Sequence, residues 1–291
     1  MISVVMPAHN EARVIRRTLE AVTRGAAPGE LEVIVVCNGC TDDTAAAARA
    51  CGGEGVQVIE TPVAGKAQAL NLGDEAARGF PRVYMDADVL LSVADIRKLA
   101  RRLEEGPILA AAPRASFEVT GCAWAVRAYY DINGRLPSAR EGIGGSGVYA
   151  LSARGRGRFG AFPALTADDG FVRIQFLPEE RATLEDCHST VFAPQSLSDL
   201  IAIKTRSHFG SYELRRNFPT LWVNKGRSNG GELLRLWKNP LLWPRLTAYC
   251  YVKIVARLRA RQRMRRGLSK TWERDESSRQ MAPANAAGGS R

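Results

Sequence analysis

The stretch RVYMDADVLL at residues 82–91 places two aspartates, Asp86 and Asp88, one residue apart where an apolar run ends. The apolar residues before the acids are typical of a buried strand. Two carboxylates in this position repel each other and lose hydration unless a positive group lies between them. Mg²⁺ or Mn²⁺ fits, because such a hard cation takes one or two carboxylates and completes its coordination with phosphate oxygens and water. The pair therefore predicts chemistry on a nucleoside diphosphate.

The chain around this pair alternates between apolar runs and amphipathic segments. The pattern predicts strands at residues 2–7, 31–36, 56–59, 82–85 and 108–112, and helices at 11–24, 42–50, 66–78 and 95–105. This alternation is typical of an α/β fold with a doubly wound, mostly parallel sheet and helices on both faces. Ligands of such sheets bind outside the carboxyl ends of the strands. The polar clusters after residues 6, 36 and 85 all fall at that edge.

The pattern loosens beyond residue 115. It predicts helices at 123–133 and 198–216, a glycine-rich run at 141–147, a strand at 148–151 and a helix that opens within 166–173. The tail from residue 275 is polar and rich in small residues, so we expect it to be disordered.

Composition narrows the function. The 291 residues suffice for one large α/β domain with an appendage. Of the net charge of +11, residues 251–291 carry +8, so the rest of the chain is nearly balanced and nucleic acid is not an expected partner. The six cysteines include one CxxC pair, Cys37 and Cys40, without the further ligands of a zinc site. We expect reduced cysteines in a cytosolic protein, because no signal peptide precedes the first strand.

Two polar motifs follow the first two strands. Residues 7–11 read Pro-Ala-His-Asn-Glu, and their polar atoms would face the same crevice as the aspartate pair. The structural alternative is a strand-to-helix turn in which Asn10 is the N-cap. Residues 38–43 open with Asn38, whose amide can both accept from and donate to a nucleobase. The alternative there is an ordinary capped loop.

Two further motifs begin helices. Lys66 starts one helix, where a cation suits a phosphate or a neighbouring carboxylate. Asp168 and Asp169 start a later helix, and either carboxylate would serve as a general base. A solvated lysine and a pair of N-capping carboxylates are the structural alternatives.

Together and in this order, the five motifs resemble those of the family 2 inverting glycosyltransferases, which have the GT-A fold of the nucleotide-diphospho-sugar transferase superfamily. The resemblance covers about residues 1–215 and implies a nucleoside diphosphate sugar as donor. The implied nucleotide-sugar-binding residues are Pro7, Ala8, Asn10, Glu11, Asn38, Asp42, Lys66 and Asp86. The implied metal ligands for Mg²⁺ or Mn²⁺ are Asp88 and Asp86, of which Asp86 would face ribose or a metal-bound water. The implied catalytic base is Asp169 or Asp168.

The chain departs from the family at three places. The base-contacting position is often Asp, and here Cys37-Asn38 stands there, which leaves the nucleobase open. The acidic motif usually reads Glu-Asp, and here it is Asp-Asp, which leaves the choice of base open. The Gln-x-x-Arg-Trp motif of processive synthases is missing, and residues 206–209 read Arg-Ser-His-Phe near its place. A single sugar transfer is therefore expected rather than polymer extension.

These observations predict a metal-dependent, inverting transfer of a hexosyl or related group to an acceptor hydroxyl, in the synthesis of cell-envelope glycan, polysaccharide or glycolipid. The base would remove the hydroxyl proton, and the carboxylate beside it would raise its pKa by like-charge repulsion. One alternative is a non-catalytic nucleotide-sugar-binding module. Another is a sugar nucleotidyltransferase, whose glycine-rich, Arg-bearing loop after strand one is not found at residues 8–11.

The domain organisation follows from these assignments. We expect residues 1–114 to form the nucleotide-sugar-binding half and 115–216 the acceptor-binding and catalytic-base half of one domain. A helical basic extension at 217–274 and a disordered tail at 275–291 would complete the chain.

The extension carries an apolar run at residues 246–258. Lys253 and Arg257 interrupt this run, so it does not form the stretch of about 20 apolar residues that spans a bilayer. We expect an interfacial helix with Trp243, Tyr249 and Tyr251 at the headgroups of anionic lipid. A helix packed on the catalytic domain is the alternative. The interfacial interpretation predicts a cytoplasmic enzyme that is peripheral at the inner face of the cell membrane and acts on acceptors that include lipid-linked ones.

Overall fold

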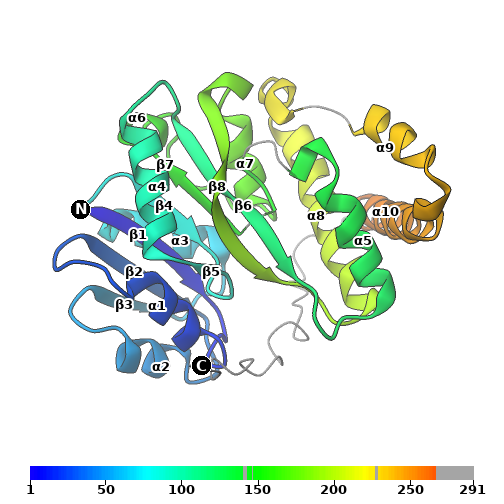
Figure 1. The fold of residues 1–291 in the computed structure, drawn as a ribbon. Coiled ribbons are helices and arrows are strands. Elements are labelled where there is room, and N and C mark those ends of the chain that lie inside the picture. The colour runs from blue at the N-terminus through cyan, green and yellow to red at the C-terminus, as the bar shows by residue number, and fades with distance from the viewer. Residues whose placement is uncertain (140–142, 146, 227–228, 267–291) are drawn as a thin grey trace, which may run out of the picture.

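The computed structural model describes residues 1–139, 143–145, 147–226 and 229–266. Within these residues a single eight-stranded sheet runs in the order β3-β2-β1-β4-β7-β6-β8-β5 (Figure 1). The strands are β1 (Ile2–Ala8), β2 (Leu31–Asn38), β3 (Val56–Thr61), β4 (Arg82–Met85), β5 (Leu90–Leu91), β6 (Ala110–Glu118), β7 (Val148–Leu151) and β8 (Arg181–Phe192). The α/β class predicted from the alternating pattern is confirmed.

The first half of the sheet is parallel, as predicted. β1 pairs in parallel with β2 and β4, and β2 pairs in parallel with β3. Every residue of β2 is buried, because helices cover both faces of the sheet. The crossovers are α1 (Ile15–Thr23), α2 (Thr44–Cys51) and α3 (Lys66–Ala76). The carboxyl ends of β1, β2 and β4 therefore meet at one edge.

The second half of the sheet is mixed. β7 runs antiparallel between β4 and β6, whereas β8 is parallel to β6 and antiparallel to β5. β8 was not predicted, because its central residues Glu185, Asp186 and His188 interrupt any apolar run and most of its side chains are half-buried or exposed. Strand β6 also continues to Glu118, six residues beyond the predicted end. Pairing with β8 extends it.

Helices pack on both faces of the sheet. On one face, α1, α2 and α4 (Val93–Glu104) bury apolar side chains such as Leu19, Ala48 and Leu99. On the other face, α3 and α7 (Asp168–Ile174) bury Leu70 and Val172. The short helix α6 (Ala153–Arg156) follows β7. The helices on the two faces therefore hold in place the strands whose ends carry the polar motifs.

A buried ion network lies on the α3 side of the sheet. Asp74 of α3 accepts hydrogen bonds from the guanidinium of Arg82 and the hydroxyl of Tyr84, both on β4, and from Arg156 Nε of α6 at 2.9 Å. Burial alone would raise the pKa of the Asp74 carboxyl, but these donors outweigh it and lower that pKa. The network therefore joins α3, β4 and α6.

A third apolar cluster joins α5 (Trp124–Gly134), α8 (Leu197–Asn217) and α10 (Trp243–Arg265). One face of α10 packs there through Leu246, Tyr249 and Val252, as in the packed alternative for this segment. The prediction that Tyr249 lies at lipid headgroups is therefore wrong, because its ring is buried in this cluster. The other face exposes Tyr251, Ile254 and Leu258. The short helix α9 (Gly230–Trp237) precedes α10 (Figure 1). The predicted disordered tail at 275–291 lies outside the described residues.

No helix in the described part of the chain is both long enough and apolar enough to cross a membrane.

Candidate active site

The structure brings residues from both halves of the chain together at the carboxyl edge of the sheet. Lys66 at the start of α3 lies between two carboxylates: its Nζ is 2.7 Å from Asp86 Oδ1 after β4 and 2.9 Å from Asp168 Oδ1 at the start of α7. Burial would lower the pKa of the Lys66 ammonium, but the charges of Asp168 and Asp86 outweigh it and raise that pKa. The ammonium therefore stays charged and links the two halves.

The neighbouring aspartates of α7 have different surroundings. The Asp168 side chain is 9% exposed and bound to Lys66. Burial raises the pKa of the Asp168 carboxyl, Lys66 opposes that shift, and the charges of Asp169 and Asp86 add to it. Asp169 is half-buried, and its Oδ2 accepts the Gly145 N–H at 2.9 Å. Asp168 is thus an ion-paired, nearly buried carboxylate, whereas Asp169 is the more accessible of the two.

Two glycines of the glycine-rich run before β7 contact this site. The Gly147 carbonyl accepts the Asp86 N–H at 2.8 Å. Gly147 has φ +65, and a Cβ there would lie 2.6 Å from Val89 Cγ2, so a side chain would not fit. Through Gly145 the same loop contacts Asp169. Residues 140–142 and 146 of the predicted run lie outside the described residues.

Tyr149 of β7 is a site residue that sequence analysis missed. It is 4% exposed, and its hydroxyl has no hydrogen-bond partner among the described residues. Burial raises the pKa of this hydroxyl, and the charges of Asp168, Asp169 and Asp86 add to the effect. The sequence gives one hint of its role, which is the polar hydroxyl of Tyr149 within an otherwise apolar short strand.

Arg17 of α1 was also missed. Its guanidinium lies 3.8 Å from the centroid of the Phe192 ring, and its Nε and Nη2 are buried without a hydrogen-bond partner among the described residues. Burial lowers the pKa of Arg17, and the carboxylates of Asp88 and Glu11 act in the opposite direction. Arg17 therefore lies close to two predicted site acids. The signal was a charged residue beside the inward apolar stripe of α1.

The loops after β1 and β2 are tied to each other. Asn10, in the left-handed region with φ 53, accepts the Thr41 N–H at 2.6 Å and donates to the Thr41 hydroxyl at 3.1 Å. Asp42 accepts the Ala12 N–H at 3.2 Å and the Thr44 N–H at 3.1 Å. Asn10 is not the N-cap of α1, which begins at Ile15. Both predicted residues thus shape the edge of the site.

Asn38 lies beneath this edge. Its side chain donates to the carbonyl of Ala8 at 2.8 Å and accepts the N–H of Gly65 at 3.0 Å. It is 3% exposed. The amide predicted to contact a nucleobase is therefore engaged with backbone, and it positions the end of β1 against the start of α3. Pro7 and Ala8 are the last two residues of β1.

The metal prediction can be compared with this donor set. No three His, Cys, Asp or Glu side chains in the described residues converge into a metal cage. Mg²⁺ and Mn²⁺ do not need one, since one or two carboxylates with phosphate oxygens and water suffice. Asp86 and Asp88 supply two hard oxygen donors, and the buried guanidinium of Arg17 near Asp88 suits a phosphate. The residues present fit the group.

The mixed eight-stranded sheet, with Asp86 directly after its central strand β4, has the GT-A fold of glycosyltransferases. The model of the family described as glycosyl transferase family 2 matches residues 3–149, about half of the chain. The chain belongs to this family.

Two curated relatives are similar to part of the chain. Glycosyltransferase AglD of Haloferax volcanii is 34% identical over 112 residues, which are 36% of this chain and 18% of AglD. An uncharacterized glycosyltransferase of Mycobacterium tuberculosis is 32% identical over 123 residues, which are 42% of this chain and 52% of that protein. The match thus spans between a fifth and a half of these relatives.

Two solved structures share the fold. The mannosyltransferase PcManGT from Pyrobaculum calidifontis, in complex with GDP-Man and Mn²⁺, has a TM-score of 0.58 at 20% identity over 91% of this chain and 74% of its own. Glucosyl-3-phosphoglycerate synthase from Mycobacterium tuberculosis has a TM-score of 0.53 at 22% identity over 74% of this chain and 79% of its own. At these identities the likeness shows the fold.

Proposed function

We propose that this glycosyltransferase moves a sugar from a nucleoside diphosphate sugar to an acceptor hydroxyl, with inversion at the anomeric carbon. The observation that carries the proposal is the Lys66 bridge. One ammonium joins Asp86, on the predicted donor side, to Asp168, which is adjacent to the predicted base Asp169. A donor bound at the first carboxylate would thus lie next to the base.

The proposed donor site is the edge formed by the ends of β1, β2 and β4. Its residues are Pro7, Ala8, Asn10, Glu11, Asn38, Asp42, Lys66 and Asp86. The solved GT-A neighbours that hold GDP-Man or UDP-Glc support this class of donor. Within the set, Asn38 acts by positioning backbone, because both ends of its amide are already engaged. The nucleobase is then read by other groups of the edge.

The proposed metal ligands are Asp88 and Asp86. Neighbours solved with Mn²⁺ or Mg²⁺ support a divalent cation. When bound, Mg²⁺ or Mn²⁺ offsets the charge that builds on the departing diphosphate. Arg17, near Asp88, adds a fixed positive charge close to the same position.

Asp169 is the proposed general base. It takes the proton of the acceptor hydroxyl as that oxygen attacks the anomeric carbon, and the bond from this carbon to the diphosphate oxygen breaks. Attack from the face opposite the leaving group inverts the configuration. Asp169 suits this role better than Asp168, because the latter is nearly buried and held by Lys66. Gly145 orients the Asp169 carboxylate through its N–H.

We further propose a peripheral place at the inner, cytoplasmic face of the cell membrane and a role in cell-envelope glycan or glycolipid synthesis. The α9–α10 region exposes large apolar side chains, and Trp237 and Trp243 stack at 6.0 Å. Such aromatic residues next to a basic helix suit the headgroups of anionic lipid. Truncation after Asn239 should abolish binding to anionic vesicles. Unchanged binding would contradict the membrane proposal.

The activity is tested by incubation with Mn²⁺ and a panel of nucleotide sugars, scored by donor hydrolysis and thermal shift. Asp169→Asn should lower transfer by about 10²-fold or more while nucleotide binding persists. Asp88→Asn should lower transfer and also remove metal-dependent nucleotide binding. A non-catalytic binding module would show no turnover in any variant and would lose binding only with Asp88→Asn.

A further inference from the structure

Two packed helices each direct a pair of basic side chains to their shared surface. Lys204 and His208 lie four residues apart on α8, and Lys253 and Arg257 lie four residues apart on α10. Residues at this spacing share a helix face. α10 packs along α8 in the third apolar cluster (Figure 1). We call these four residues the α8–α10 basic cluster.

The charges of the cluster act on one another across the helix contact. Burial lowers the pKa of Lys204 to about 8, and the charge of Lys253 adds to the effect. Burial also lowers the pKa of Lys253 to about 8, with Arg257 adding to it. The pKa of His208 falls to about 4 through burial and the charges of Lys253, Arg257 and Lys204. Lys204, Lys253 and Arg257 are therefore close enough to repel one another, and His208 beside them is neutral at pH 7.

Little on the surrounding elements compensates this charge. The ion pairs found among the described residues include none to Lys204, His208 or Lys253. The two ammonium groups instead face aromatic rings: Lys204 Nζ lies 5.3 Å from the centroid of Tyr129, and Lys253 Nζ lies 5.8 Å from that of Tyr249.

Acidic side chains are also scarce around the cluster. α10 contains no Asp or Glu. On α5, the carboxylate of Asp131 is already paired with Arg135 and Arg245. A half-buried basic cluster of this kind is costly unless an anion joins it.

One member of the cluster, Lys204, lies near the candidate base. Asp169 is the carboxylate whose charge opposes the lowering of the Lys204 pKa. α7 and α8 meet closely at Gly210, where a Cβ would lie 2.7 Å from Ala167 Cβ. Lys204 precedes Gly210 by six residues, or roughly 9 Å along the helix axis. A group held by the cluster would be within one small molecule's length of Asp169.

We propose that the α8–α10 basic cluster binds a phosphate group of the acceptor. This rests on the proposed sugar transfer, because the acceptor is the molecule that must bring its hydroxyl to Asp169. Lys, His and Arg donors suit phosphate oxygens, and their mutual repulsion would be relieved once the phosphate is bound. The cluster would orient the acceptor hydroxyl toward Asp169.

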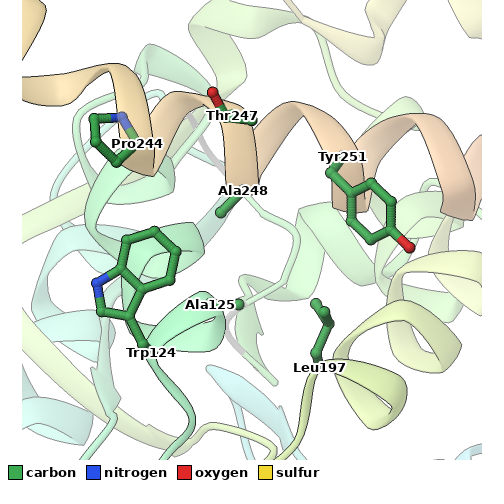
Figure 2. Close-up of a pocket in the computed structure, with 7 residues that line it drawn as sticks. All are labelled: Trp124, Ala125, Leu197, Pro244, Thr247, Ala248 and Tyr251. Atoms are coloured by element: carbon green, nitrogen blue, oxygen red, sulfur yellow. The ribbon is translucent and has the colours of Figure 1, made fainter.

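An apolar groove of about 450 Å³ lies between the first turns of α5 and α8 and one face of α10 (Figure 2). Its walls include Trp124 of α5, Leu197 of α8 and Tyr251 of α10. Tyr251 precedes Lys253 by two residues on α10, so the groove and Lys253 lie on different faces of that helix. The phosphate belongs either to a lipid or to a soluble phosphate ester, and the groove is not part of the argument for its binding. The shared chemistry is the phosphate, and the experiment separates the sources.

The test is calorimetric titration of the full chain, with the donor site filled by a nucleoside diphosphate and Mn²⁺. The probes are octyl phosphate, glycerol 3-phosphate and octanol. Both phosphates should bind, and octanol should bind at least tenfold more weakly than octyl phosphate. Tighter binding of octyl phosphate than of glycerol 3-phosphate supports a lipid acceptor, and equal binding supports a soluble one. Equal binding of octyl phosphate and octanol overturns the proposal.

Variants locate the site. Lys204→Gln and Lys253→Gln should each raise the Kd for the phosphates about tenfold or more, since a hydrogen bond to a charged group is lost. Arg259→Gln, on the exposed side of α10, removes the same charge from the same helix and should change the Kd less than twofold. Equal effects in all three variants would mean only general electrostatics and overturn the proposal. Thermal unfolding of each variant confirms that it folds.

The two proposals fail separately. Absence of nucleoside diphosphate binding in the same samples would refute the donor site, whereas the phosphate titration could still succeed. Competition between nucleoside diphosphate and octyl phosphate for one site would instead refute the acceptor assignment and leave the donor site intact.

Discussion

Replacing a lysine of the α8–α10 basic cluster should stabilise the unliganded protein. Lys204→Met keeps the length of the side chain and removes its charge. The pKa of Lys204 is lowered from 10.5 to about 8 in the folded protein. This difference means that the charged ammonium destabilises the folded state by about 3 kcal/mol. The variant also loses the cation–π contact with the Tyr129 ring, which destabilises it by about 1 kcal/mol. The net gain is about 2 kcal/mol at pH 7.

The pH dependence gives this prediction a second readout. Between pH 8 and about 10.5 the unfolded chain keeps the Lys204 proton while the folded chain loses it, so wild-type stability rises with pH in that window. The charges that face Lys204 are those of Lys253, Arg206 and Asp169, and all are kept in the variant. The advantage of Lys204→Met should therefore shrink above pH 8 and vanish by about pH 10.5.

The measurement is thermal and urea unfolding of wild type and variant from pH 7 to pH 10.5. A gain of about 2 kcal/mol corresponds to a rise in Tm of about 3 °C for a chain of this size. Lys238→Met, at an exposed position, is the matched control and should leave Tm unchanged. A variant that is less stable than wild type at pH 7, or whose gain does not depend on pH, would refute the reasoning.

Three further predictions concern the site and its support. Lys66→Met leaves the nearly buried Asp168 carboxylate without its partner and should cost about 3–5 kcal/mol at pH 7, and less in acid, where that carboxyl takes a proton; urea unfolding at neutral and acidic pH checks this. Asp74→Asn should cost about 3–5 kcal/mol and also flatten the acid limb of the stability profile, because the lowered pKa of Asp74 contributes stability that is lost as pH falls through it. Gly147→Ala forces a Cβ at 2.6 Å from Val89 and should lower Tm and transfer together, whereas unchanged values would show that the loop moves freely.

The sequence predicted the parallel half of the fold well because its signals are local. Buried parallel strands are continuous apolar runs, and β2 is such a run from Leu31 onward. The second half depends on pairings that no local pattern reveals. β8 is a strand because β6 and β5 lie on either side of it, although Glu185, Asp186 and His188 break its apolar pattern. Its place in the sheet comes from tertiary context.

The candidate site residues were predictable where a motif stands at the end of a strand or the start of a helix. They were not predictable where a side chain inside a strand or helix reaches the site through tertiary packing. Asp86 and Lys66 were found because they stand at element ends. Asp168, which shares the Lys66 ammonium with Asp86, was singled out as a motif, but the ion bridge between the three residues was not predicted. Arg17 and Tyr149 were missed, because each lies inside an element and only the packing shows that it faces the acids. Asn38 was found, but its backbone contacts were visible only in three dimensions.

The Lys66 bridge constrains how this enzyme can be redesigned. Because one ammonium neutralises Asp86 and Asp168 at once, a substitution at either carboxylate leaves Lys66 with excess charge and changes the field at the other. Libraries that vary Asp86 and its neighbours on the proposed donor edge alone would therefore also disturb Asp168, beside the proposed base. The three positions would have to be varied together for the charge of the bridge to stay balanced.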